Sequence, residues 1–387
     1  MQLGWLKKLS LVSASLAGGS LAIPAASLAN PASAGTATTA PVFSELRLKY
    51  LHYQESQDGY DRMAVKAPSL GFTLAMSEAW SAQGYLVSDG ISGASPAYYT
   101  DPDSFTPVND ERNASDFRLS RHWANSQLTL GLAYSHEADY LSRNTSLLWR
   151  QSSQDRNQSY ELGYSISRDT INPVTGIVEN EKKNVQEWLV GVGLVLSPLD
   201  VVQVSLVHSR GLGYYSDPYK RFDLRPSKKE QTALSFVWNH HFESSGRSHR
   251  FGLRLYDDSF GIGSVTLSSE LHQPLGQGWS VSPVLRLYSQ SAAYFFSPPD
   301  PASPKRPAIP QGHRLGQDPI SFDQRLARLG AYTLGLKLEK RVSAQLSVDL
   351  KYEFYQQANR WTKHGSNTPG LDDFTAYSVQ LGLTRRF

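Results

Sequence analysis

The sequence of 387 residues contains no cysteine, and this absence excludes several kinds of protein. A disulfide framework, a thiolate metal site and a lipid anchor on cysteine all need the missing residue. Long apolar runs are also absent beyond the N-terminus, because no later segment approaches the roughly 18 consecutive apolar residues of a membrane helix. The mean hydropathy of −0.39 resembles that of a soluble protein. Neither the lack of long apolar runs nor the mean hydropathy argues against a β-barrel, since only alternate residues of each strand face lipid.

The N-terminus has the order of features found in a secretory signal peptide. Two lysines precede an apolar run from Leu9 to Ala26, and small residues follow, with cleavage expected after Ala29 or Ala34. We predict a signal peptide over residues 1–34 and a single mature domain over residues 35–387. Removal of the two lysines with the signal peptide lowers the formal charge from +3 to +1 (3 − 2). A charge this close to zero gives no argument for a nucleic-acid partner.

The mature chain is a succession of segments in which apolar and polar residues alternate. Leu70–Met76, Leu128–Tyr134 and Tyr332–Leu338 each present one apolar face, as a strand between oil and water must. About sixteen such segments can be counted, an even number as bacterial barrels require. We predict an all-β fold, a transmembrane antiparallel β-barrel of about sixteen strands with short periplasmic turns and long extracellular loops.

The last strand ends on an aromatic residue. Its apolar face consists of Tyr377, Val379, Leu381, Leu383 and Phe387. A terminal aromatic residue on such a face resembles the signal that outer-membrane barrels present to the barrel assembly machinery. We therefore predict this machinery as a partner, together with outer-membrane lipid, and the cell outer membrane as the location.

Connection lengths and tryptophans support the same fold. The predicted even-numbered turns are short, whereas odd-numbered connections are often long, at 91–113, 171–183, 210–228, 292–322 and 357–373. Several tryptophans lie next to short turns, where they would form an aromatic girdle at one membrane interface. These predicted membrane-interface aromatics are Trp80, Trp123, Trp149, Trp238 and Trp279.

If the apolar faces point outward, charged residues line the lumen. The candidates are Arg47, Lys49, Arg118, Arg150, Glu187, Arg250, Arg254, Glu270, Arg286, Lys337, Asp349, Lys351 and Glu353. Sixteen strands leave an interior wide enough for water. Either these charges line a diffusion channel with a modest preference for anions, or they pair with one another and with infolded loops to fill the barrel.

The sequence offers little for catalysis or metal binding. His240 and His241 are adjacent and would face opposite sides of a strand, so they cannot both ligate one metal. His208 and Ser209 meet the same objection as a base and nucleophile. We predict no catalytic residues, no metal, no cofactor and no enzymatic activity.

Several segments also resemble a known family. They are Tyr50–Glu55 with Tyr60–Pro68, Ser88–Pro96, Tyr140–Arg143, Ser209–Lys220 with Arg221–Pro226, Gln231–Phe242, Ser289–Phe295 and Thr384–Phe387. These are similar to an uncharacterised family of Gram-negative proteins, domain of unknown function 3570. The resemblance implies an envelope protein with no assigned activity, and it implies a periplasmic lipoprotein or redox protein as a partner.

Three functions are then open. The first is a channel or porin-like protein for a small polar or anionic solute. The alternative is a non-conducting barrel scaffold that houses or anchors a periplasmic lipoprotein or redox partner. An outer-membrane hydrolase is a third possibility, which would need a Ser, His and acid cluster at one rim.

Overall fold

The computed structural model describes residues 39–57, 60–300, 302–362 and 367–387 of the chain. The predicted signal peptide, residues 1–34, lies outside these residues. Within them, helix is limited to two 3-10 turns, Pro102–Ser104 and Gln324–Leu326. No helix in the described part is long and apolar enough to cross a membrane.

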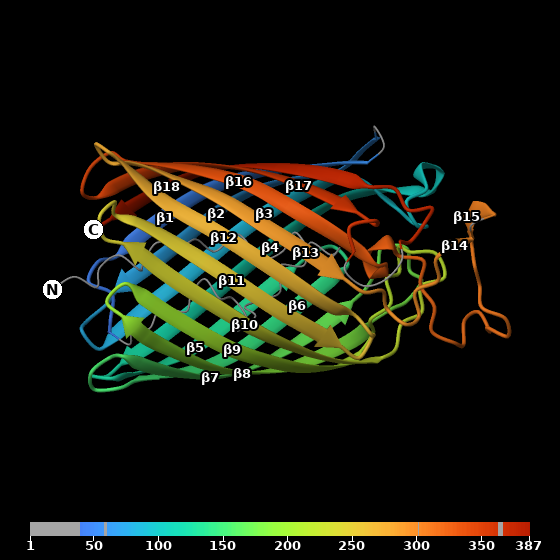
Figure 1. Cartoon of the computed structure of the whole chain (residues 1–387). Coiled ribbons are helices and arrows are strands. Elements are labelled where there is room, and N and C mark those ends of the chain that lie inside the picture. The colour runs from blue at the N-terminus through green and yellow to red at the C-terminus, as the bar shows by residue number, and fades with distance from the viewer. Residues whose placement is uncertain (1–38, 58–59, 301, 363–366) are drawn as a thin grey trace.

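Sixteen antiparallel strands close into one barrel, and the first strand pairs with the last (Figure 1). The strands of the barrel are β1 (Glu45–Gln57), β2 (Tyr60–Ala75), β3 (Trp80–Pro96), β4 (Phe105–His122), β5 (Ser126–His136), β6 (Tyr140–Ser152), β7 (Gln158–Ile171), β8 (Glu181–Ser197), β9 (Asp200–Gly213), β10 (Lys228–Phe242), β11 (Arg247–Asp258), β12 (Gly263–Gly276), β13 (Trp279–Gln290), β16 (Leu329–Arg341), β17 (Leu346–Ala358) and β18 (Phe374–Arg386). A separate hairpin, β14 (Pro299–Asp300) and β15 (Ser303–Pro307), projects from the end with the long loops (Figure 1). The predicted barrel of about sixteen strands is confirmed.

The alternation of side chains explains which face of the wall is apolar. In β5, Leu130 and Leu132 are 46% and 51% exposed, whereas their neighbours Thr129 and Ala133 are buried. Successive residues of a strand point to opposite faces. Exposed leucines therefore cover the outside of the barrel. Its interior receives mainly small or polar side chains, together with one buried apolar cluster that includes Tyr53.

The two ends of the barrel differ in their connections. At the end that carries the C-terminus the turns are short, as at 123–125 and 198–199 (Figure 1). At the opposite end, called external below, long connections occupy 214–227, 291–328 and 359–373.

The prediction of a long loop over 91–113 is wrong. β3 continues to Pro96 and β4 begins at Phe105, and these two residues face each other at the end of an unbroken ladder. The outward positions of these strand ends carry residues such as Ser92 and Asn109. Because no apolar face continues into this region, the sequence there has no strand periodicity to detect.

Candidate functional site

The inner wall of the barrel carries the charged residues of the predicted lumen. Residues directly opposite on paired strands point to the same face, and the register sets Arg250 against Glu270 and Lys337 against Lys351. The register and the alternation along each strand place all of the candidates on the inward side, namely Arg47, Lys49, Arg118, Arg150, Glu187, Arg250, Arg254, Glu270, Arg286, Lys337, Asp349, Lys351 and Glu353. The interior is therefore polar along much of its length.

Ion pairs neutralise many of these cations. The pairs along the wall are Arg47–Glu45, Arg118–Asp116 (2.9 Å), Arg150–Glu161 (2.7 Å), Lys337–Glu339 (3.1 Å) and Lys351–Glu353 (2.9 Å). All but Arg150–Glu161 join residues two apart on one strand, which point the same way. The pairing offsets much of the basic excess that the sequence predicts for the lumen.

Sequence reasoning also missed inward carboxylates, namely Glu45, Glu55, Asp89, Glu161 and Asp169. Asp89 forms a buried pair with Arg112, whose Nη2 lies 2.5 Å from Asp89 Oδ2. Glu161 could have been identified, because Tyr160 and Leu162 on either side of it are exposed. Inward cations were missed as well, such as Lys183, which pairs with Asp169 at 3.1 Å, so the added carboxylates are largely paired.

Three of the inward cations lie together on β11 and β13, and we call them the inner arginine strip: Arg250, Arg254 and Arg286. Across the adjoining strand β12, Arg250 faces Glu270, but Arg254 faces Thr266 and Arg286 faces Ser268. The guanidinium of Arg254 lies 5.2 Å from the ring centre of Tyr256, a cation–π contact. Two of the three arginines thus lie beside hydroxyl residues, where an anion could approach them.

Loops close over the external end of the barrel. We call their described parts, within 97–104, 214–227, 291–328 and 359–373, the external plug. Tyr99, Ile320 and Phe322 are each at most 3% exposed and pack with Tyr98 and Leu371 in one apolar cluster. The cluster draws on three of the four loops, so they are held together across the mouth.

A network of buried ion pairs joins the fourth loop to the plug. Arg325 pairs with Asp217 and, at 2.5 Å, with Asp323, while Arg225 pairs with Asp323 at 2.9 Å and with Asp223 at 2.7 Å. The side chains of Asp223 and Asp323 have no exposed surface. Burial alone would raise the pKa of Asp323, but Arg325, Lys220 and Arg225 hold it well below its usual range. Asp323 is therefore ionised and shared by two guanidinium groups.

A group of three carboxylates lies in and beside the β5–β6 turn. One oxygen each from Asp110, Glu137 and Asp139 lies within 4.8 Å of the others. Burial raises the pKa of Glu137 to about 7, against the opposing effect of Arg112, and the neighbouring carboxylates add to the rise. The Tyr219 hydroxyl donates to Asp139 at 2.7 Å. The group has these protein partners, and we assign it no ion.

The predicted interface aromatics lie towards the end with the short turns. Trp80 and Trp279 begin β3 and β13, Trp123 follows β4, and Trp149 and Trp238 lie near the ends of β6 and β10 that lead into short turns. Of these, Trp80, Trp123 and Trp279 are 38%, 47% and 46% exposed. Cations lie over their rings, as Lys340 does over Trp279 at 5.0 Å. This arrangement is typical of an interface, where an aromatic ring sits between oil and water.

The C-terminal strand presents its apolar residues outward. Tyr377, Leu381, Leu383 and Phe387 are 40%, 55%, 37% and 61% exposed, and Val379 shares their side of the strand. The guanidinium of Arg385 lies 5.0 Å from the ring centre of Phe387. Arg385 is the one charged residue on this side of the strand, and it packs against the terminal ring.

His240 and His249, on the outer wall near the short turns, do not form a catalytic relay with the described residues around them. The Ser269 hydroxyl lies 2.8 Å from His249 Nε2, whereas Asp200 contacts His240, the residue opposite His249, at 2.8 Å. In a Ser–His–acid relay, one imidazole contacts both other groups. Here the serine and the carboxylate contact different imidazoles.

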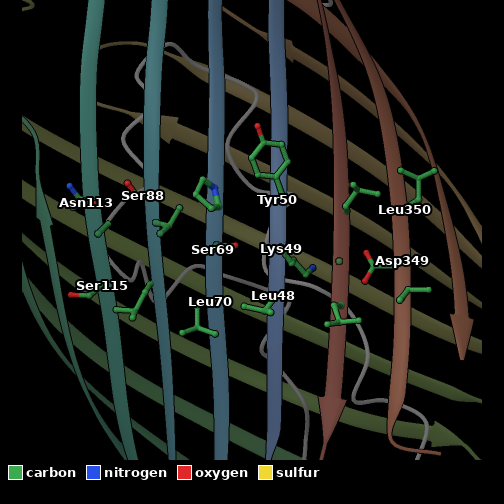
Figure 2. Close-up of a pocket in the computed structure, with 18 of the residues that line it drawn as sticks. Leu48, Lys49, Tyr50, Ser69, Leu70, Ser88, Asn113, Ser115, Asp349 and Leu350 are labelled. Atoms are coloured by element: carbon green, nitrogen blue, oxygen red, sulfur yellow. The ribbon is translucent and has the colours of Figure 1, made fainter. Parts of the chain in front are cut away.

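A hollow of about 1200 Å³ lies along the outer wall. Outward apolar side chains form most of it, including Leu48 and Tyr50 of β1, Leu70 of β2 and Leu350 of β17, which Figure 2 labels. The inward-facing Lys49 and Asp349 contribute from the same strands. Since the lining is mainly that of the apolar exterior, hydrocarbon is the natural occupant of this hollow.

A closed barrel with an apolar exterior and a charged interior defines the class, an outer-membrane-type β-barrel. The chain belongs to the family described as "Protein of unknown function (DUF3570)", which matches residues 99–180 and 175–374. The resemblance predicted from the sequence is therefore confirmed. No curated protein matches the chain.

The solved structures with a similar fold include the following three, each of low sequence identity. A bacterial polysaccharide outer membrane secretin is 10% identical with a TM-score of 0.49, covering 89% of this chain and 98% of that one. Pseudomonas aeruginosa OccK2 (OpdF) in complex with glucuronate is 8% identical with a TM-score of 0.45, covering 89% and 98%. The siderophore receptor PirA from Pseudomonas aeruginosa is 16% identical with a TM-score of 0.41, covering 87% of this chain and 62% of the receptor. This chain thus spans less than two thirds of the receptor's length.

Proposed function

We propose that the protein is an outer-membrane channel for a small polar solute, with a preference for anions set at the inner arginine strip. The short turns and the C-terminus lie in the periplasm, and the external plug faces the medium. In this conformation the plug covers the mouth, so passage requires the loops to move.

The observation that carries this proposal is the polar inner wall. Charged pairs and hydroxyl groups line it along much of its length, as they line water-filled outer-membrane barrels. Barrels of sixteen strands leave an aqueous interior. Arg254 and Arg286 provide a local positive field in that interior, which favours anions.

The test is conductance of the purified, folded protein in a planar bilayer, with the reversal potential recorded under a salt gradient. We expect discrete openings with anion preference, and a shift of the reversal potential towards cations in the variant Arg254→Gln/Arg286→Gln. Lys66→Gln, which removes an exposed cation from the outer face of β2, is the matched control and should leave the potential unchanged. Openings with the same selectivity in all three proteins would refute the role of the arginines. No openings at all, even after loosening of the plug, would refute the channel.

A second function is the non-conducting scaffold that houses or anchors a periplasmic lipoprotein or redox partner. The external plug favours it, because a barrel that never opens outward still presents a periplasmic end. Cross-linking in cells, with a photoreactive residue in the 198–199 turn, tests it. A specific adduct together with no conductance would support the scaffold, and absence of any adduct would count against it.

A further inference from the structure

The outer wall of the barrel carries a group of cations near its external end. We call it the external basic patch: Arg143, Arg168, Lys182, Arg210 and Lys228. These residues belong to five successive strands, β6 to β10, and all are exposed. Their strand neighbours Ser142, Asn144 and Asp169 are buried on the inner side. By alternation, the patch points outward, away from the lumen.

The patch is poor in compensating negative charge. Arg143 and Arg168 are direct cross-strand partners, and like charges in this arrangement destabilise a sheet. Among the described residues, neither makes an ion pair or a hydrogen bond. Arg210 and Lys228 share a single carboxylate, Glu230, at 3.8 and 2.8 Å. An anion between the two arginines would relieve their repulsion.

Lys182 extends the patch by one position towards the external loops. Its Nζ donates to the Thr170 hydroxyl at 3.0 Å, and Thr170 is the outward residue that follows Arg168 on the same strand face. The ammonium is thus held beside the arginine pair, on the side away from the apolar band. Three cations surround one stretch of the outer wall.

The patch lies directly beyond the apolar band of the same strands. On β6 and β7 the last exposed apolar residues are Leu147 and Tyr164, each four positions from an arginine of the patch. On β9 the exposed Leu206 lies four positions before Arg210, and the exposed Leu212 lies two positions beyond it. Four residues of a strand span about 13 Å, and a strand tilt of about 45° reduces this to about 9 Å along the membrane normal. The cations therefore stand at the depth of lipid headgroups.

We propose that the external basic patch binds the phosphate groups of an acylated, phosphorylated glycolipid in the external leaflet of the membrane. Guanidinium groups bind phosphate in a bidentate geometry, and cations beside an apolar band can hold a headgroup while the acyl chains lie against the leucines below. The charge of the patch selects a phosphorylated lipid over a neutral one. This proposal rests on the membrane orientation given under the proposed function, but it does not depend on conduction.

The test is equilibrium binding of lipid to the folded full-length barrel in neutral detergent, measured by native mass spectrometry. The probes are a bisphosphorylated, acylated glucosamine disaccharide and the same lipid without phosphates. Arg143→Gln/Arg168→Gln should bind the phosphorylated lipid about thirtyfold more weakly than wild type, since each cation near an anionic headgroup contributes about fivefold. Binding of the lipid without phosphates should be unchanged. Lys66→Gln, an exposed outward cation on the opposite part of the wall, is the control and should bind like wild type.

Equal binding of the phosphorylated lipid by wild type and the double variant would overturn the proposal. It would also be overturned if wild type bound both lipids equally, or if inorganic phosphate at the same concentration displaced the lipid fully, which would indicate a simple anion site. The heat-dependent gel mobility of folded barrels shows that each variant is folded. Conductance of the same samples is recorded separately, so failure of lipid binding and failure of the channel are distinguishable.

Discussion

Asp323 is the residue whose replacement tests the external plug most directly. It accepts hydrogen bonds from Arg225 Nη2 at 2.9 Å and from Arg325, and its side chain is fully buried. It is also the N-cap of the short helix Gln324–Leu326, where its side chain accepts a hydrogen bond from the Arg325 backbone N–H at 3.0 Å. Asparagine caps a helix as well as aspartate does. Asp323→Asn therefore removes the charge and keeps the cap.

The size of the effect follows from the burial of the network. Removing one partner of a buried ion pair costs about 3–5 kcal/mol, because the other charge is left without compensation. Arg225 and Arg325 retain Asp223 and Asp217, so we expect the lower value, about 3 kcal/mol. If this energy stabilises only the closed plug, the ratio of closed to open protein falls by roughly two orders of magnitude.

Two assays report the opening. In a planar bilayer, Asp323→Asn should spend a larger fraction of time open than wild type, and limited proteolysis should cut its loops faster while the barrel stays intact. Asp318→Asn is the matched control, since Asp318 belongs to the same connection but forms an exposed ion pair with Arg314. Surface pairs contribute little, so this variant should behave like wild type. Identical conductance and proteolysis in wild type and Asp323→Asn would refute the network as the element that holds the plug closed.

Other predictions concern single residues. Burial raises the pKa of Glu137 to about 7 from the ordinary 4.5, so the folded state gains protons relative to the unfolded chain and stability falls as pH rises between these values. The variant Glu137→Gln should lose this pH dependence, and its free energy of unfolding by urea at pH 8 should exceed that of wild type by at most about 3 kcal/mol. An unchanged pH profile would refute the role of Glu137. Burial lowers the pKa of Lys220 to about 8 from 10.5, so the plug should resist protease better as pH rises across that range, and Lys220→Met should lose this dependence. Phe387→Ser should reduce the amount of folded barrel in cells, whereas Phe242→Ser, another exposed aromatic near a short turn, should not; equal loss in both would contradict a terminal assembly signal.

The barrel wall could be predicted from the sequence because one physical rule governs it. A strand between hydrocarbon and water must alternate, and Leu130 and Leu132 beside Thr129 and Ala133 show the rule in the sequence and in the structure. The same rule places Arg254 and Lys351 on the inner face. It does not extend to strand ends that leave the apolar band, which is why the sequence predicts β3 and β4 to be shorter than they are.

The partners of charged residues could not be predicted in the same way. The Arg150–Glu161 pair depends on the register between β6 and β7, which alternation alone does not specify. The contacts within the plug are still harder to predict from the sequence, because Arg225 and Asp323 are 98 residues apart and belong to different loops. Loops carry no periodic pattern, so their contacts arise only once the barrel has brought their ends together.

The plug also separates the two candidate functions, because each makes a different demand on it. A channel needs closed and open states of similar free energy, so weakening the network at Asp323 must increase conductance. A scaffold needs only a stable cap, so the same substitution loosens the loops and leaves a barrel whose lumen is occupied from the periplasmic side. Faster proteolysis with greater conductance in Asp323→Asn therefore supports the channel. Faster proteolysis with no conductance supports the scaffold, since it shows that the plug was not what blocked the path.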